Sequence, residues 1–152
     1  IQARFETVTE AFLDSARILN IVPEFGLQTI HRDETHLIGR NNNLPRVERA
    51  IDLLHARDIP FEVSLIYGLP NQTPESFASS VAWLRQRGVS VIRAFPLMLL
   101  RGTELYRRRH DLGLRESEEP IPVVIESPSF GPDAYAEMAA LAASLQSPRI
   151  AA

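Results

Sequence analysis

The 152-residue sequence contains neither cysteine nor lysine, and these two absences remove several kinds of chemistry. Without cysteine the chain holds no disulfide, no thiolate nucleophile and no thiolate ligand for a metal or an iron–sulfur cluster. All 16 basic residues are arginine, so a lysine Schiff base is also excluded. Chemistry within this chain therefore depends on carboxylates, hydroxyls, amides, imidazoles and guanidinium groups.

The sequence also lacks long apolar runs and a strong charge of either sign. No run approaches the roughly 20 apolar residues that cross a bilayer, and no signal peptide is visible. The net charge of −3 gives no electrostatic reason to expect nucleic acid or an anionic membrane as a partner. A hydrophobic content of 45% is typical of a globular domain, which we expect in the cytoplasm.

The stretch from Pro60 to Thr73 organises the rest of the chain. Its first half alternates with a period of two, which predicts a strand with two different faces. We expect one face to pack against helices and the other to face the interior of a barrel. The helix-facing set is Phe61, Val63 and Leu65, and the interior-facing set is Glu62, Ser64 and Ile66.

A turn and a helix start follow this strand directly. Gly68 and Pro70 end the strand, and Thr73 is a good helix cap because proline and glutamate come next. A strand, a tight turn and a capped helix make one β-to-α step of an α/β fold. In such folds ligands bind where the strands end.

Elsewhere the sequence predicts strands and helices in alternation, which implies right-handed crossovers and a parallel sheet. We expect residues 89–97 to form a strand buried on both faces, because they are almost continuously apolar. The remaining predicted strands are 1–5, 22–28 and an edge strand at 121–125. The predicted helices are 8–19, 33–39, 45–54, 73–88, 103–113 and 135–145, with residues 41–43 as a loop.

Three predicted strand ends carry motifs whose order along the chain is informative. They are GLQT at 26–29, SLIYGLPNQTPESF at 64–77 and FPLMLLRGTEL at 95–105. Ile38-Gly39-Arg40 follows the first by about a dozen residues. In this order they resemble the second half of a radical S-adenosylmethionine (radical SAM) domain. The pattern is shared by oxygen-independent coproporphyrinogen oxidases and cobalamin-binding radical SAM proteins.

The resemblance covers residues 1–115 and implies an α/β fold, the C-terminal half of a partial (β/α) TIM-like barrel with parallel strands. Residues 116–152 would form a C-terminal extension with a terminal helix. The family binds SAM and a [4Fe–4S] cluster, and abstracts hydrogen from substrate with a 5′-deoxyadenosyl radical. The substrate, here expected to be a small molecule, is not specified by these residues.

The sequence departs from the family because the three cysteines that hold the cluster are absent. They would lie upstream of Ile1, which is not a start methionine. We therefore expect a fragment whose partner is the missing N-terminal half of the barrel, and which alone is inactive.

The resemblance implies roles in cofactor binding for five residues. Gln28 matches a polar strand end against the SAM ribose or methionine, and Arg40 matches the arginine that pairs the SAM carboxylate. Ser64 stands where an aspartate often binds the ribose, and Ile66 matches the residue beside adenine. Glu6 matches a carboxylate at the end of the third barrel strand.

The backbone of residues 94–96 resembles the segment that reads the adenine edge. No catalytic residue is identified, and the four histidines lack the spacing of a metal site. Glu24 and Glu62 share strand faces with Gln28 and Ser64, so we expect them to pair with Arg93 in a buried network or to act as acid or base.

Plainer readings of the same residues stay open. Gln28 can simply cap a strand end, Arg40 can be a solvated arginine at a helix end, and Ser64 and Ile66 can belong to the core. Two other functions also fit. One is a non-catalytic, degenerate half-barrel that binds a partner, and the other is a different (β/α) enzyme that binds phosphate or sugar at the Gly68–Pro70 turn.

Overall fold

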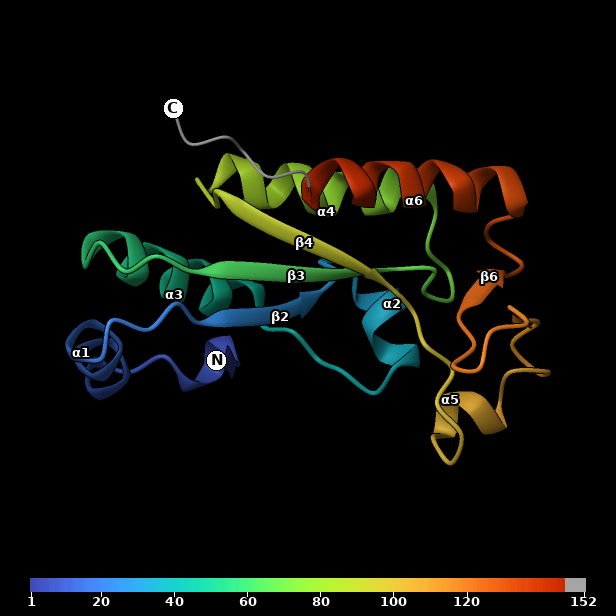
Figure 1. The fold of residues 1–152 in the computed structure, drawn as a ribbon, viewed down its shortest axis with the longest axis horizontal. Helices are drawn as coiled ribbons and strands as arrows, with labels where there is room; N and C mark the ends of the chain where they lie inside the picture. Colours follow the sequence, from blue (N-terminus) through green and yellow to red (C-terminus); the bar gives the residue numbers. More distant parts are fainter. Residues whose placement is uncertain (147–152) are drawn as a thin grey trace.

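Within residues 1–146, which the computed structural model describes, four parallel strands form one sheet (Figure 1). The order across the sheet follows the order along the chain, and each neighbouring pair is parallel. The strands are β1 (Gln2–Ala3), β2 (Glu24–Gln28), β3 (Glu62–Tyr67) and β4 (Val91–Pro96). The predicted α/β organisation around a parallel sheet is therefore confirmed.

Helices connect the strands and begin where the sequence supplies caps. Thr9 accepts a hydrogen bond from the N–H of Phe12, and Thr73 forms a reciprocal capping box with Ser76. The helices are η1 (Phe5–Thr7, 3₁₀), α1 (Glu10–Ile18), α2 (Arg32–Leu37), α3 (Leu44–Ala56), α4 (Pro74–Gln86), α5 (Glu104–Arg107) and α6 (Pro132–Gln146). No helix among these combines the length and apolar character needed to cross a bilayer.

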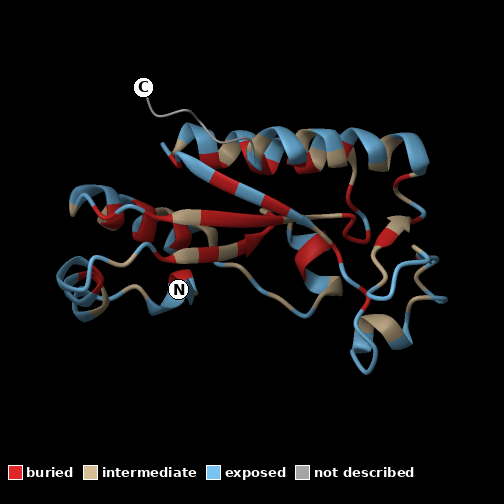
Figure 2. Ribbon diagram, in the orientation of Figure 1, coloured by how far each residue is buried: buried red, intermediate tan, exposed pale blue. Residues whose placement is uncertain are grey.

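The hydrophobic core lies between the sheet and the helices, as Figure 2 shows. Alternate residues of the strands point into it, and the helices contribute one stripe each. The predicted helix-facing residues of β3 are buried. Of the predicted interior-facing set, Glu62 and Ile66 are half-buried and Ser64 is buried, but all three line cavities, which agrees with the predicted register. The largest fully buried side chains from these elements include Phe25, Leu27, Leu65, Ile51, Leu54, Phe77 and Leu84.

The segment after residue 115 packs back onto the sheet. Helix α6 lies along β4 and α4 (Figure 1), and its Met138 and Ala142 are buried in the common core. Gln146 Nε2 donates a hydrogen bond to the carbonyl of Ala94, 2.6 Å away, on β4. The strands β5 (Arg115–Glu116) and β6 (Val124–Glu126) form an antiparallel pair. Residues 147–152 of the predicted extension lie outside the described residues.

Two sequence-based expectations about this half of the chain were wrong. Strand β4 is not buried on both faces, because Val91, Arg93 and Phe95 are exposed on the face that the described residues leave open. The helix expected over 103–113 stops after Arg107. The Tyr106 carbonyl accepts hydrogen bonds from the backbone N–H of Arg109 at 3.4 Å and from Arg109 Nη1 at 2.8 Å, so the i to i+4 pattern is not continued there.

Candidate functional site

Strand β2 ends in an irregular step at Gln28. The pairing with β3 is regular up to Gly26 and then slips, so that Gln28 pairs with Leu65. Gln28 has a φ of 72°, a left-handed conformation that costs energy for a residue with a side chain. Its side chain is buried, with 9% of the residue exposed.

Gly26 leaves the space in which two candidate ligands approach one another. A Cβ at Gly26 would lie 2.9 Å from Nε2 of Gln28 and 3.7 Å from Nη1 of Arg40. A contact of 2.9 Å is too short for a carbon, so any larger residue would displace the Gln28 amide. The glycine therefore lets an amide and a guanidinium lie over the same point of the strand.

The end of α2 explains how Arg40 reaches this point. The N–H of Arg40 donates to the carbonyl of Thr35 at 3.0 Å, and that of Gly39 donates to His36 at 3.2 Å. Gly39 has a φ of 67°, which completes the helix-ending arrangement known as a Schellman motif. The chain reverses at Gly39, so Arg40 lies back toward β2.

The guanidinium of Arg40 is half-buried, and within residues 1–146 no carboxylate lies at ion-pair distance from it and no side-chain hydrogen bond engages it. Burial lowers the pKa of Arg40, the nearby charge of Arg4 lowers it further, and Glu6 partly offsets both. A cation with open donors, removed from much of the solvent, favours a planar anion such as a carboxylate.

Four cavities within the described residues are lined by Arg40, and three of them are also lined by other candidate ligands. One of about 500 Å³ is lined by Gln28, Arg40 and Ser64, and one of about 400 Å³ by Gln28, Arg40 and Ile66. A smaller one of about 100 Å³ is lined by Glu6 and Arg40. All five predicted cofactor residues are thus brought to one edge of the sheet, while their binding of a cofactor stays a prediction.

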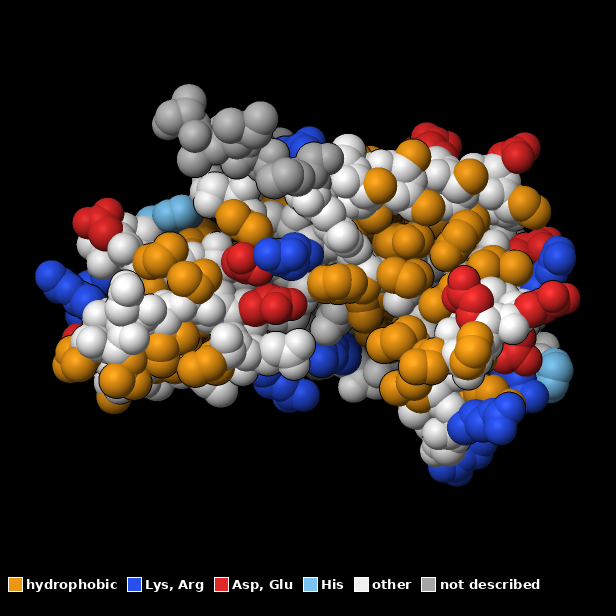
Figure 3. All heavy atoms as spheres, viewed as in Figure 1, with side chains coloured by type: hydrophobic (Ala, Val, Ile, Leu, Met, Phe, Trp, Pro, Cys, Tyr) orange, Lys and Arg blue, Asp and Glu red, His pale blue; other side chains and the backbone are white. Residues whose placement is uncertain are grey.

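The second cavity has an apolar wall that the sequence did not single out. Leu97, Met98 and Leu100 line it together with Ile66. Met98 and Leu100 are about half exposed, at 51% and 47%. Figure 3 shows apolar side chains gathered where β4 leads into this segment. The arrangement places an apolar surface beside the polar pair of Gln28 and Arg40.

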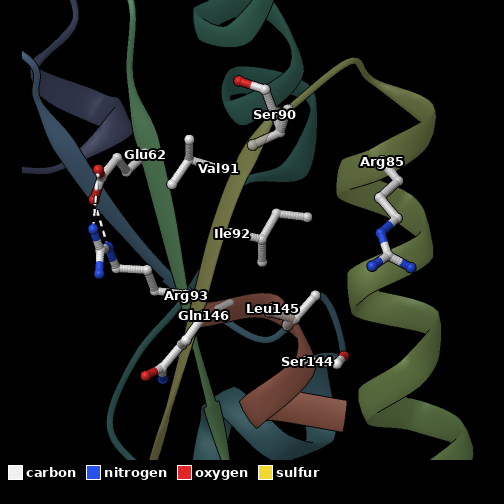
Figure 4. Close-up of a pocket in the computed structure, with 10 residues that line it drawn as sticks. Glu62, Arg85, Ser90, Val91, Ile92, Arg93, Ser144, Leu145 and Gln146 are labelled. Atoms are coloured by element: carbon white, nitrogen blue, oxygen red, sulfur yellow. Dashed lines mark hydrogen bonds and ion pairs between the residues drawn. The ribbon is translucent and has the colours of Figure 1, made fainter. Parts of the chain in front are cut away.

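Charged residues lie on the same open face, nearer the beginning of the strands. Arg93 Nε donates to Glu62 at 2.7 Å and Nη2 donates at 3.3 Å (Figure 4). The hydrogen bonds from Arg93 hold the pKa of Glu62 below its usual range. The predicted pairing is confirmed for Glu62. The expected burial was wrong, because the Arg93 side chain is 45% exposed. Within residues 1–146, Glu24 forms neither a hydrogen bond nor an ion pair with Arg93.

A cavity of about 340 Å³ lies beside this ion pair. Figure 4 shows the residues that line it. Arg85 of α4 and Ser144 of α6 line it together with the first residues of β4. It therefore lies toward the amino end of β4, whereas the cavity shared by Gln28, Arg40 and Ile66 lies at the carboxyl ends of the strands.

The Gly68–Pro70 turn is closed by a side chain from within the same loop. Gln72 is fully buried, and its Oε1 accepts hydrogen bonds from the N–H groups of Gly68 at 2.7 Å and Leu69 at 3.1 Å. Its Nε2 donates to the carbonyl of Ile66 at 3.0 Å. These two N–H groups are the donors that a phosphate at the turn would require, and Gln72 already occupies them.

Sequence reasoning missed Gly26, Asn42 and Gln146. Gln146 engages the Ala94 carbonyl, so one acceptor of the predicted adenine-reading segment is already in use. Asn42 lies in the run of three asparagines for which the sequence predicts only a loop. Asparagine is frequent where a side chain must bond nearby backbone, and this run was the signal available.

No family model matches the chain. Among curated proteins, it is 32% identical over 81 residues to the oxygen-independent coproporphyrinogen III oxidase of Paracoccus denitrificans, and 41% identical over 56 residues to that of Salmonella typhimurium. These matches cover 53% and 35% of this chain but only 16% and 12% of the two relatives. The chain thus matches only a small part of either enzyme.

Solved structures are similar over nearly the whole chain. Coproporphyrinogen III oxidase (HemN) from Escherichia coli, a radical SAM enzyme, gives a TM-score of 0.66 at 20% identity, covering 95% of this chain and 30% of that one. The radical SAM methyltransferase TsrM from Kitasatospora setae, solved with tryptophan and a SAM analogue, gives 0.69 at 15% identity, covering 97% and 36%. The chain therefore resembles the radical SAM superfamily, and its parallel sheet with flanking helices has the fold of part of a radical SAM barrel.

Proposed function

We propose that this chain forms part of the SAM-binding surface of a radical SAM enzyme. The observation that carries the proposal is the half-buried guanidinium of Arg40, which has no ion-pair partner within residues 1–146 and meets the Gln28 amide over Gly26 near the carboxyl end of β2. TsrM, whose fold is similar, has been solved with a SAM analogue and also with cobalamin and a [4Fe–4S] cluster.

The residues around Arg40 suit the chemistry of SAM. The guanidinium would pair the methionine carboxylate, a charge-assisted contact worth roughly 1.5–3 kcal/mol. The Gln28 amide and the Ser64 hydroxyl can hydrogen-bond polar groups of the methionine and ribose moieties. Ile66 and the apolar wall after β4 offer a surface to the adenine. Glu6 lines a cavity together with Arg40 and moderates the repulsion from Arg4.

The residues do not fit a [4Fe–4S] cluster, because the sequence supplies no thiolate. We infer that the ligands of the cluster come from outside these 152 residues and that this chain alone does not cleave SAM. Hydrogen abstraction from an unidentified small molecule is the reaction class that the resemblance implies. A cytoplasmic location stays a prediction.

Titration of the chain with SAM, followed by NMR or calorimetry, tests the proposal. Arg40→Ala should weaken binding by roughly tenfold or more, since a charge-assisted pair is lost. Arg46→Ala is a matched control because Arg46 is exposed on α3, close in sequence, and lines none of the described cavities. Equal affinity of the two variants, or no binding by the unmodified chain, would refute the SAM site.

A non-catalytic half-barrel that binds a partner is the second candidate, and it applies if no cysteine motif accompanies these 152 residues. It predicts no SAM binding at any concentration that leaves the fold intact. A phosphate or sugar site at the Gly68–Pro70 turn is less well supported, because Gln72 occupies the N–H groups there. Titration with inorganic phosphate and with a sugar phosphate, in the same assay, separates these readings.

A further inference from the structure

One side chain connects the two central residues of the proposed site. Asn42 Nδ2 donates to the carbonyl of Leu27 at 2.6 Å and to that of Thr29 at 3.1 Å. These carbonyls belong to the residues on either side of Gln28. Asn42 itself stands two residues after Arg40, in the segment that joins α2 to α3.

The backbone at Gln28 must be bent for one nitrogen to reach both carbonyls. In an extended strand they would lie about 6.6 Å apart, which exceeds the reach of one nitrogen at these distances. Here the N–H of Thr29 donates to the carbonyl of Leu27 at 3.0 Å, and Gln28 between them has a φ of 72°. These are the features of the three-residue γ-turn with positive φ, which is rare and strained.

The far side of this turn is held by a buried network. Thr29 Oγ1 donates to Glu34 at 2.5 Å, and Glu34 also accepts from Ser76 Oγ of α4 at 2.5 Å. Glu34 is only 1% exposed, so the network is shielded from water. Hydrogen bonds through the Glu34 carboxylate therefore connect Thr29 to α2 and α4. The carbonyls of Leu27 and Thr29 are held by Asn42.

The segment that carries Arg40 is anchored to two elements, α2 and β2. Its beginning is held by the bond from the Arg40 N–H to Thr35 of α2, and its end by the bonds of Asn42 to β2. The backbone positions of Arg40 and Gln28 are thus coupled through one amide group.

We propose that Asn42 is a positioning residue that stabilises the strained turn at Gln28 and thereby sets the Gln28 amide against the Arg40 guanidinium. The consequence for ligand affinity rests on the proposed SAM site. The effect on the turn does not, since it concerns only bonds within the chain.

Asn42→Asp is the sharpest test, with Asn43→Asp as its matched control. Both changes add one carboxylate to the same loop. At position 42 the donor is lost and two carbonyls face a negative oxygen. At position 43 the oxygen that caps α3 by accepting from the Arg46 N–H is kept. If Asn42→Asp does not fold by circular dichroism, Asn42→Ala removes the donor without adding charge.

Two measurements distinguish an effect on the Gln28 turn from an effect on SAM binding. Backbone ¹³C shifts of Gln28 report its φ without any ligand, and they should move toward extended values in the Asn42 variant but not in Asn43→Asp. SAM affinity should fall about tenfold in the Asn42 variant and less than twofold in the control. In an Arg40→Ala background most of the Asn42 effect should vanish, whereas a merely structural role would leave it intact.

Unchanged Gln28 shifts in the Asn42 variant would overturn the inference. So would an undiminished effect on affinity in the Arg40→Ala background. If the unmodified chain does not bind SAM while the Gln28 shifts move as expected, the proposed function fails and the role of Asn42 in the turn stands.

Discussion

The two faces of the sheet formed by β2, β3 and β4 are built from alternating residues of the same strands, yet they differ in how far their side chains are exposed to solvent. On the helix-covered face, Phe25, Val63 and Leu65 are completely buried. On the open face, Arg93 and Phe95 remain nearly half exposed. The covered face therefore supplies most of the stability of the fold, and the open face carries the candidate binding site.

The energetics of the two faces differ accordingly. Full burial of a large aliphatic or aromatic side chain stabilises the fold by about 1.5–3 kcal/mol, whereas an exposed ion pair contributes about 0–1 kcal/mol. Substitutions on the covered face should therefore lower the free energy of unfolding. Substitutions on the open face should change ligand affinity and leave the fold standing.

The largest expected effect is on the covered face. Leu65→Ala should lower the free energy of unfolding by about 2–5 kcal/mol, because the surrounding core cannot collapse into the cavity. Phe95→Ala, on the open face of β4, should cost less than about 1 kcal/mol. Urea denaturation of both variants checks the contrast. Similar losses for the two would mean that the open face is also packed in solution.

The next effect concerns the space over Gly26. Gly26→Ala should weaken SAM binding by about tenfold, since its Cβ would displace the Gln28 amide. Gly26 does not have a positive φ, so alanine fits its backbone and the free energy of unfolding should change by less than about 1 kcal/mol. Isothermal titration beside a urea melt measures both quantities. A large loss of stability with unchanged affinity would assign Gly26 to the core instead of the site.

A third prediction concerns Tyr67 and Tyr135, whose rings are in contact. Burial, with a contribution from Tyr67, raises the pKa of Tyr135 to about 12. Because this value exceeds the unfolded value of about 10, the stabilising contribution is complete below pH 10 and is lost as the pH rises through 12. The loss should not exceed about 1 kcal/mol, since both rings are partly solvated.

Denaturation at pH 9 and at pH 11 tests this expectation. Tyr135→Phe should flatten the pH dependence, and Tyr106→Phe, whose ring packs under Arg109, serves as control. An equal slope for Tyr135→Phe and the unmodified chain would show that other groups cause the alkaline loss.

The smallest effect belongs to the open-face ion pair. Glu62→Gln should lower the free energy of unfolding by about 0.5 kcal/mol at pH 7 and low salt. The folded-state pKa of Glu62 is lowered, so its contribution is present above the unfolded value of about 4.3 and is lost as the pH falls below it. Melts at pH 7 and pH 3, with and without 1 M salt, measure it. A larger loss that salt does not reduce would place the pair in a less solvated environment than its exposure indicates.

Local sequence patterns were sufficient to predict most of the helices and strands. The Thr73-Pro74 start predicted α4, and the glycine before Arg40 predicted the end of α2, because caps and chain reversals depend on residues within one turn. The short strand β5 was missed, since a two-residue strand has no periodicity to detect. The end of α5 after Arg107 was missed because residues 108–112 contain neither the glycine nor the proline that usually marks a helix end.

For the site, the sequence by itself determined which residues stand at strand ends, and parity determined that Ser64 and Ile66 share a face of β3. Only the tertiary structure decided that Gln28 and Arg40 meet over Gly26 and that Asn42 ties them together. The physical reason is that alternation is set by the geometry of one strand, whereas these contacts join segments whose approach depends on a bulge, a strained turn and a helix end acting together. The prediction that both faces of β4 are buried was wrong for the same reason. An apolar run indicates a preference for burial, but it does not determine which segment covers each face.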